Sequence, residues 1–104
     1  MEEQNPSAIV GRRDTNINLC LAAAQAAMES GEYADADKLY KRGLIWSEEQ
    51  YGAQSAAVGL VLMKIVELYE KDGRQRDTTR LQKRIGDIFR RYFFQSVFKK
   101  LEGR

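Results

Sequence analysis

The segment Gly31–Ile45, GEYADADKLYKRGLI, decides the fold because the chain repeats its pattern. The segment Gly73–Asp87, GRQRDTTRLQKRIGD, aligns with it without gaps at a spacing of 42 residues. The glycine, an aspartate, a leucine and a Lys-Arg pair coincide in the two segments. A glycine after a helical apolar pattern ends that helix, and the residues that follow begin another. The repeat therefore predicts two helical hairpins in tandem.

Apolar residues recur at helical spacing in four stretches of the 104 residues. The helices are expected around 17–28, 33–51, 58–69 and 81–93, the first capped by Asp14-Thr15-Asn16. The last stretch forms one long helix, or turns near Gln95-Ser96 into a short fifth helix. No alternating run flanks an Asn-Gly or Asp-Gly turn, so the pattern predicts an all-α chain. The expected rigid core is Tyr33, Leu39, Tyr40, Leu44, Ile65, Tyr69 and Leu81.

The repeat resembles the tetratricopeptide repeat, in the 42-residue variety found in kinesin light chains. The resemblance is carried by Ala27–Leu44 and Leu62–Ile85, and by the loop Tyr51–Val58 between them. It implies two stacked hairpins, a fragment of a right-handed α-solenoid. The second repeat departs at Gln75, Thr78 and Gln82, where the family prefers an aromatic, an alanine and an aromatic. Its hairpin is therefore expected to pack less ideally.

These patterns divide the chain into three parts. Residues 1–13 lack periodicity and contain Pro6 and Gly11, which predicts a flexible N-terminal arm. Residues 14–88 form the two-repeat domain. Residues 89–104 form a C-terminal helix that caps the stack or dimerises.

The resemblance also implies a binding site, because the first helix of each hairpin lines a concave groove in such solenoids. The groove is expected to take a segment of another protein, its leucines and methionines contacting apolar side chains and its lysines a backbone or carboxylate. The alternative is that these residues merely cover a helix face. The implied groove residues are Asn18, Leu21, Gln25, Met28, Leu60, Met63, Lys64, Glu67 and Lys71.

The C-terminal segment is a second candidate surface, since it carries more apolar area than one helix face should show to water. It caps the stack or pairs with a second copy, and homodimerisation is the expected form of self-association. The alternatives are a membrane surface and, as the weaker one, nucleic acid. The candidate contact residues are Phe89, Arg90, Arg91, Tyr92, Phe93, Phe94, Phe98, Lys99 and Lys100.

Net charge separates the two ends of the chain. Residues 1–73 hold 7 basic and 12 acidic residues, whereas residues 74–104 hold 10 basic and 3 acidic ones. Such asymmetry is expected where the ends meet different partners or each other, including an acidic first repeat meeting the basic tail of the next copy. The simpler interpretation is a solvated basic face on the last helix.

Catalysis finds little support in the composition. The chain has no histidine and one cysteine, Cys20, at a helix-packing position, where a buried structural thiol is expected. The carboxylate pairs Asp35-Asp37 and Glu48-Glu49 are interpreted as solubilising charges. No glycine cluster suggests a phosphate loop, and no apolar stretch reaches about 18 residues. We therefore expect a cytoplasmic adaptor with no catalytic residues, metal or cofactor.

Overall fold

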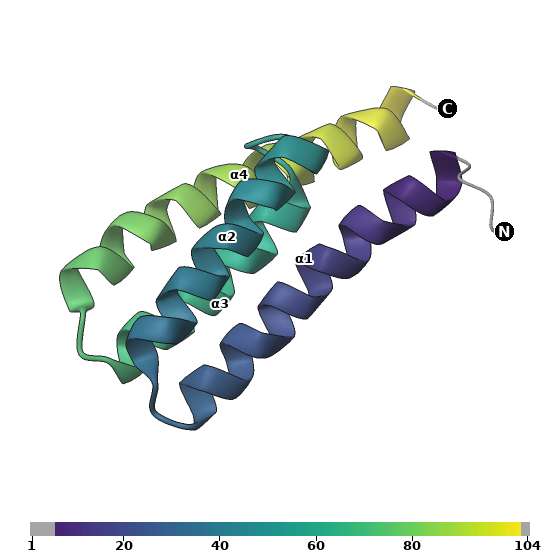
Figure 1. Ribbon diagram of the computed structural model, residues 1–104. Helices are drawn as coiled ribbons and strands as arrows, with labels where there is room; N and C mark the ends of the chain where they lie inside the picture. Colours follow the sequence, from purple (N-terminus) through teal and green to yellow (C-terminus); the bar gives the residue numbers. More distant parts are fainter. Residues whose placement is uncertain (1–5, 103–104) are drawn as a thin grey trace, which may run out of the picture.

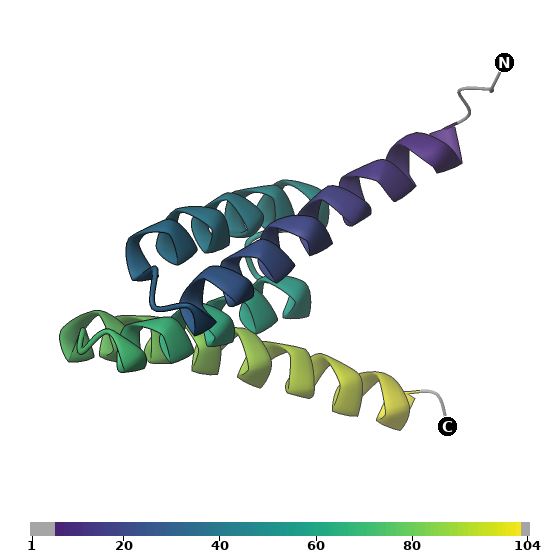
Figure 2. The same ribbon diagram turned by 60° about the horizontal axis from the view of Figure 1, so that its bottom comes forward.

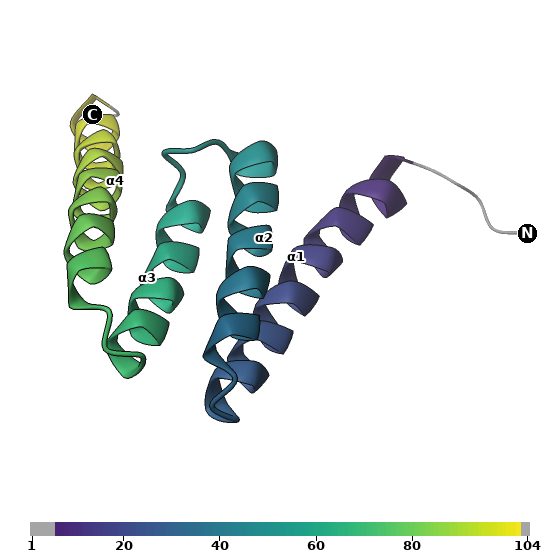
Figure 3. The ribbon, with the colours of Figure 1, turned by 60° about the vertical axis from the view of Figure 1, so that its left-hand side comes forward.

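The computed structural model describes residues 6–102, with side chains for 15–97 and for 99 and 100. Within this range the chain is all-helical and contains no strand. The helices are α1 (Pro6–Glu29), α2 (Tyr33–Tyr51), α3 (Ala56–Lys71) and α4 (Gln75–Glu102). Figure 3 shows them as a row in chain order, each antiparallel to the one before, with α1 and α4 at the two edges. The predicted all-α fold is therefore confirmed.

The turns after α1 and α3 repeat each other in detail. Gly31 and Gly73 occupy equivalent places with φ of 83° and 76°, a region that a residue without Cβ adopts at little cost. The amide that follows each glycine donates to the carbonyl five residues earlier: Glu32 to Ala27 at 2.8 Å, and Arg74 to Tyr69 at 2.8 Å. The internal repeat is therefore present in the backbone as well as in the sequence.

Two apolar clusters hold the helices together. The larger joins α1, α2 and α3, and the smaller joins α3 to α4 through Val58, Leu62 and Ile88, all fully buried. Every predicted core residue lies in or against a cluster, so the predicted core is confirmed. The larger cluster consists of Ala24, Met28, Ala36, Tyr40, Val61, Ile65, Leu68 and Tyr69.

Small residues set the distances between paired helices. A Cβ on Gly43 would lie 2.9 Å from a methyl carbon of Leu21, and one on Gly59 would lie 2.6 Å from the Phe89 ring. Thr78 is 3% exposed, and its hydroxyl donates a hydrogen bond to the Arg74 carbonyl oxygen at 3.1 Å. The core tolerates this buried hydroxyl because the backbone oxygen accepts its hydrogen bond.

Both end helices are longer than the sequence pattern indicates. α1 begins at Pro6 and not at Asp14, so the predicted arm is wrong for residues 6–13, while residues 1–5 lie outside the described range. Proline is favoured at the first helical position, and the good helix formers Ala8, Arg12 and Arg13 extend a helix already nucleated by packing.

α4 is one helix through Gln95 and Ser96, so neither a short fifth helix nor a cap folded back on the stack is formed. Its position 93 corresponds to Tyr51, the last residue of α2. Residues 94–102 therefore extend beyond the repeat, and Figure 2 shows this end of α4 projecting away from the other helices. The start of α1 projects toward the same end of the molecule and diverges from α4.

Candidate functional site

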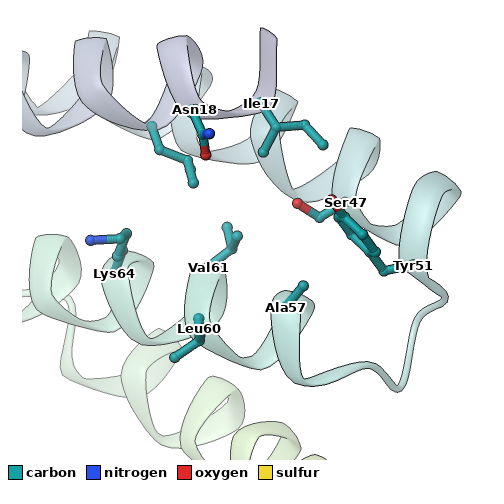
Figure 4. Close-up of a pocket in the computed structure, with 9 residues that line it drawn as sticks. Ile17, Asn18, Ser47, Tyr51, Ala57, Leu60, Val61 and Lys64 are labelled. Atoms are coloured by element: carbon teal, nitrogen blue, oxygen red, sulfur yellow. The ribbon is translucent and has the colours of Figure 1, made fainter. Parts of the chain in front are cut away.

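A hollow of about 370 Å³ opens where α1, α2 and α3 meet. Figure 4 shows Asn18 and Lys64 toward one end, Ser47 and Tyr51 toward the other, and Ile17 and Val61 facing each other between them. Its floor is buried and mainly apolar, with the Ser47 hydroxyl as its polar group, and its rim carries an amide, a phenol and an amine. The lining residues are Ile17, Asn18, Leu21, Ser47, Tyr51, Ala57, Leu60, Val61 and Lys64.

The positions of the apolar residues along α3 explain why this one helix contributes side chains to both the core and the hollow. Leu62 is fully buried against α4, whereas Leu60 is 55% exposed and Met63 49% exposed. Residues two positions apart on a helix point in very different directions, so these neighbours belong to different surfaces. Exposed leucine and methionine side chains thus stand at the edge of the hollow.

The surface continues along α3 into an adjoining hollow of about 460 Å³. Leu60 and Lys64 line both hollows, and Met63 and Glu67 complete the second. One exposed strip of α3 therefore offers apolar side chains together with one positive and one negative charge. This composite surface, the two hollows together, is called the groove below.

The structure brings some of the predicted groove residues together. Asn18, Leu21, Leu60 and Lys64 line the first hollow, and Met63 and Glu67 line the second with them. Leu21 is half-buried, and the other side chains are at least partly exposed.

Three predicted groove residues lie elsewhere. Met28 is 3% exposed and belongs to the core, so its prediction as a groove contact is wrong. The physical reason is the angle of α1, which lies close to α2 at their shared turn and diverges toward its own N-terminus (Figure 3). The hollow therefore opens near Ile17 and closes before Met28. Gln25 is exposed and donates to Glu29 at 3.2 Å, and Lys71 is exposed at the end of α3; neither lines a hollow.

Sequence reasoning missed Ile17, Ala57 and Val61 as groove residues, and it missed the contribution of α2. Gly43, Ser47 and Tyr51 follow Tyr40 on one face of that helix, 3, 7 and 11 residues further along the chain. This periodicity could have indicated that α2 contributes to the groove, since it continues the core face of α2 to the end of the helix.

A polar network behind the groove ties α2 to α3 and to the second turn. The Tyr69 hydroxyl donates to Asp37 at 2.9 Å, Lys41 contacts the same carboxylate at 3.0 Å, and the Arg74 guanidinium lies 3.9 Å from the Tyr69 ring centroid. Burial raises the pKa of Tyr69, and its hydrogen bond to Asp37 raises that pKa further. The hydrogen bond to Asp37 raises the pKa of Lys41. These residues do not line the groove, so the role of the network is to hold α2, α3 and the turn after α3 rigidly together.

The remaining candidates for chemistry are dispersed. Glu48 accepts a 2.6 Å hydrogen bond from Arg84 and so links α2 to α4, and Cys20 is half-buried. Among the described residues there is no group of three or more side chains of the kinds that bind metal ions. None of the helices described is both long and apolar enough to cross a bilayer. The lining of the groove is suited to holding an apolar side chain with hydrogen bonds at the rim.

The second predicted surface is partly exposed and partly packed. Tyr92, Phe93 and Phe94 are 55%, 63% and 53% exposed. Phe89 is half-buried and its ring lies close to Gly59, so only part of this side chain is exposed for a contact. Arg90, Arg91, Lys99 and Lys100 are exposed, while the Phe98 side chain lies outside the described residues.

Comparisons of the chain with protein-family models, with curated proteins and with solved structures find no match.

Proposed function

We propose that the chain is a small cytoplasmic adaptor, built of two tetratricopeptide-like hairpins, that binds a segment of another protein in the groove. The observation that carries the proposal is the pair of exposed side chains Leu60 and Met63 beside an apolar hollow. Exposed apolar groups next to a concave surface with a polar rim are typical of peptide-binding sites.

Two observations support the stacked-hairpin arrangement. The turns at Gly31 and Gly73 are equivalent at the 42-residue spacing, and α2 and α4 begin at equivalent positions, Tyr33 and Gln75. The first helices of the two hairpins, α1 and α3, both line the hollow. In a helical solenoid these helices form the concave binding face.

The groove suggests how a partner segment would be held. An apolar side chain of the partner enters between Ile17, Leu21 and Leu60, where it removes apolar area from water. The Asn18 amide lies at one end of the hollow and hydrogen-bonds the partner backbone. Lys64, at the same end, favours an acidic residue or a carbonyl group beside that apolar side chain.

Selection of peptides from a random displayed library on the immobilised full chain tests this proposal. We expect selected peptides to combine an apolar anchor with a nearby acidic residue. Leu60→Glu should weaken their binding by about tenfold or more, because it removes an apolar contact and adds a charge at the rim. The matched control is Leu19→Glu, since Leu19 is 62% exposed on α1 and does not line the groove. Peptides that bind both variants equally well would contradict the proposal.

A further inference from the structure

The outer face of α4 changes character along the helix. Its inner face, toward α3, carries Leu81, Ile85 and Ile88. The opposite face carries seven exposed residues at successive spacings of three or four positions, and these therefore lie on one line. They are Arg76, Arg80, Lys83, Asp87, Arg90, Phe94 and Val97. The line is basic in the first part of the helix and apolar in the second.

The apolar part is a compact patch at the projecting end of the molecule. Phe93 and Phe94 are 63% and 53% exposed, their rings meet edge to face with centroids 6.5 Å apart, and Val97 is 36% exposed. Figures 1 and 2 show this end of α4 passing the ends of α2 and α3, and in Figure 2 it diverges from the start of α1. The rest of this molecule therefore leaves a large part of Phe93, Phe94 and Val97, the patch discussed below, exposed to solvent.

Positive charge is concentrated on the same helix. Residues 74–100 contain nine basic residues and two acidic ones, Asp77 and Asp87. Both carboxylates contact arginines, Asp77 to Arg74 at 2.9 Å and Asp87 to Arg90 at 3.2 Å. Residues 15–73 contain nine acidic and five basic residues. A partner that matches both features of α4 is negatively charged and covers apolar surface.

A symmetric pairing of two copies through the patch does not satisfy both demands. Arg90 and Arg91 precede the patch and Lys99 and Lys100 follow it. Whether two such helices run parallel or antiparallel, positive groups of one copy lie beside positive groups of the other. Like charges across an interface oppose association. Nucleic acid would neutralise the basic residues but would offer no hydrocarbon to Val97.

We propose that α4 binds the surface of an anionic lipid bilayer and lies in its plane. The patch enters the interfacial region, where phenylalanine and aliphatic side chains leave water. The basic residues of the line, Arg76, Arg80, Lys83 and Arg90, contact the anionic headgroups along the rest of the helix. The residues that line the groove come from α1, α2 and α3, so the groove stays open to a protein partner in the bound state. The chain then holds that partner at a membrane.

Co-sedimentation of the full chain with lipid vesicles tests the proposal. We expect binding to vesicles of phosphatidylcholine with phosphatidylserine and little binding to phosphatidylcholine alone. Phe93→Ser with Phe94→Ser should lower the partition coefficient about 100-fold, from the apolar transfer of two phenylalanines. Arg80→Gln with Lys83→Gln should lower it about 30-fold, and high salt should act in the same direction.

The matched control is Leu19→Ser with Ile45→Ser, because these residues are 62% and 53% exposed outside the groove and away from α4. This variant should bind the anionic vesicles like the unmodified chain. Far-UV circular dichroism verifies that every variant is folded.

Three results would overturn the proposal. The first is no binding to the anionic vesicles, and the second is binding that survives the double phenylalanine change. The third is a chain that does not bind vesicles but forms a dimer or binds single-stranded RNA, where the double phenylalanine change abolishes that dimer or that RNA binding. Peptide binding is scored separately with Leu60→Glu, so failure at the membrane leaves the adaptor proposal to its own test.

Discussion

Leu62→Ala and Leu60→Ala make the same chemical change two positions apart on α3, with very different expected consequences. The Leu62 side chain is fully buried between α3 and α4, in contact with the cluster of Val58 and Ile88. The Leu60 side chain is 55% exposed at the groove. The pair therefore separates the residues that hold the fold from those that form the groove.

The expected size of the Leu62 effect follows from its burial. The change removes three carbons from the core, worth about 2.4 kcal/mol at ~0.8 kcal/mol per buried CH₂ group. The cavity left behind adds to this, which gives a loss of about 2 to 5 kcal/mol in the free energy of unfolding. Leu60→Ala should change the same free energy by about 0.5 kcal/mol or less, as for other exposed positions.

Thermal unfolding followed by circular dichroism measures the difference. A chain of this length unfolds with an entropy of about 0.21 kcal/mol/K, so Leu62→Ala should lower Tm by about 10 to 24 °C. Leu60→Ala should shift Tm by about 2 °C or less. Equal shifts for the two variants, or a larger one for Leu60→Ala, would refute the assignment of these side chains to core and groove.

Three further predictions concern the turns and the polar network. Ser55→Ala should cost about 0.5 to 2 kcal/mol in a urea titration, because the Ser55 hydroxyl accepts from the amide of Val58 at 3.2 Å and caps α3. Gly31→Ala and Gly73→Ala should each cost about 1 to 2 kcal/mol, since both have positive φ; a clearly unequal cost would contradict the equivalence of the turns. Burial raises the pKa of Tyr69, so its contribution to stability is complete below about pH 10 and is lost as pH rises through its folded-state pKa. In urea unfolding curves, Tyr69→Phe should be less stable than the unmodified chain at pH 7, because it lacks the hydrogen bond to Asp37. It should also lose less stability than the unmodified chain as the pH is raised. Equal stability of the two proteins at pH 7 would show that this hydrogen bond contributes nothing.

Sequence periodicity predicted the helical core well because burial there follows local spacing. Tyr40, Ile65 and Tyr69 recur on the faces that their helices bury, and all three are buried. The same reasoning failed for Met28, which has the spacing of a groove residue but lies where α1 and α2 converge. Helical spacing gives the direction of a side chain around its own axis, and says nothing about the angle at which the next helix crosses.

The ends of the helices also differ between what local spacing predicts and what the tertiary structure decides. Apolar periodicity begins at Ile17, yet α1 begins at Pro6, because a helix extends from its packed part without needing an apolar stripe there. The exposure of Phe93 and Phe94 depends on α4 continuing straight past the end of the repeat. Sequence alone left open whether these side chains fold back onto the stack.

The sequence by itself determined that the chain is helical, where its turns lie and which side chains form its core. These properties depend on residues close together in the chain, through helical spacing and the freedom of Gly31 and Gly73. Only the tertiary structure decided where a hollow opens and that α2 contributes Ser47 and Tyr51 to it. It also decided that the apolar end of α4 lies beyond its neighbours. Those features depend on the angles between helices, which arise from the packing of many side chains at once.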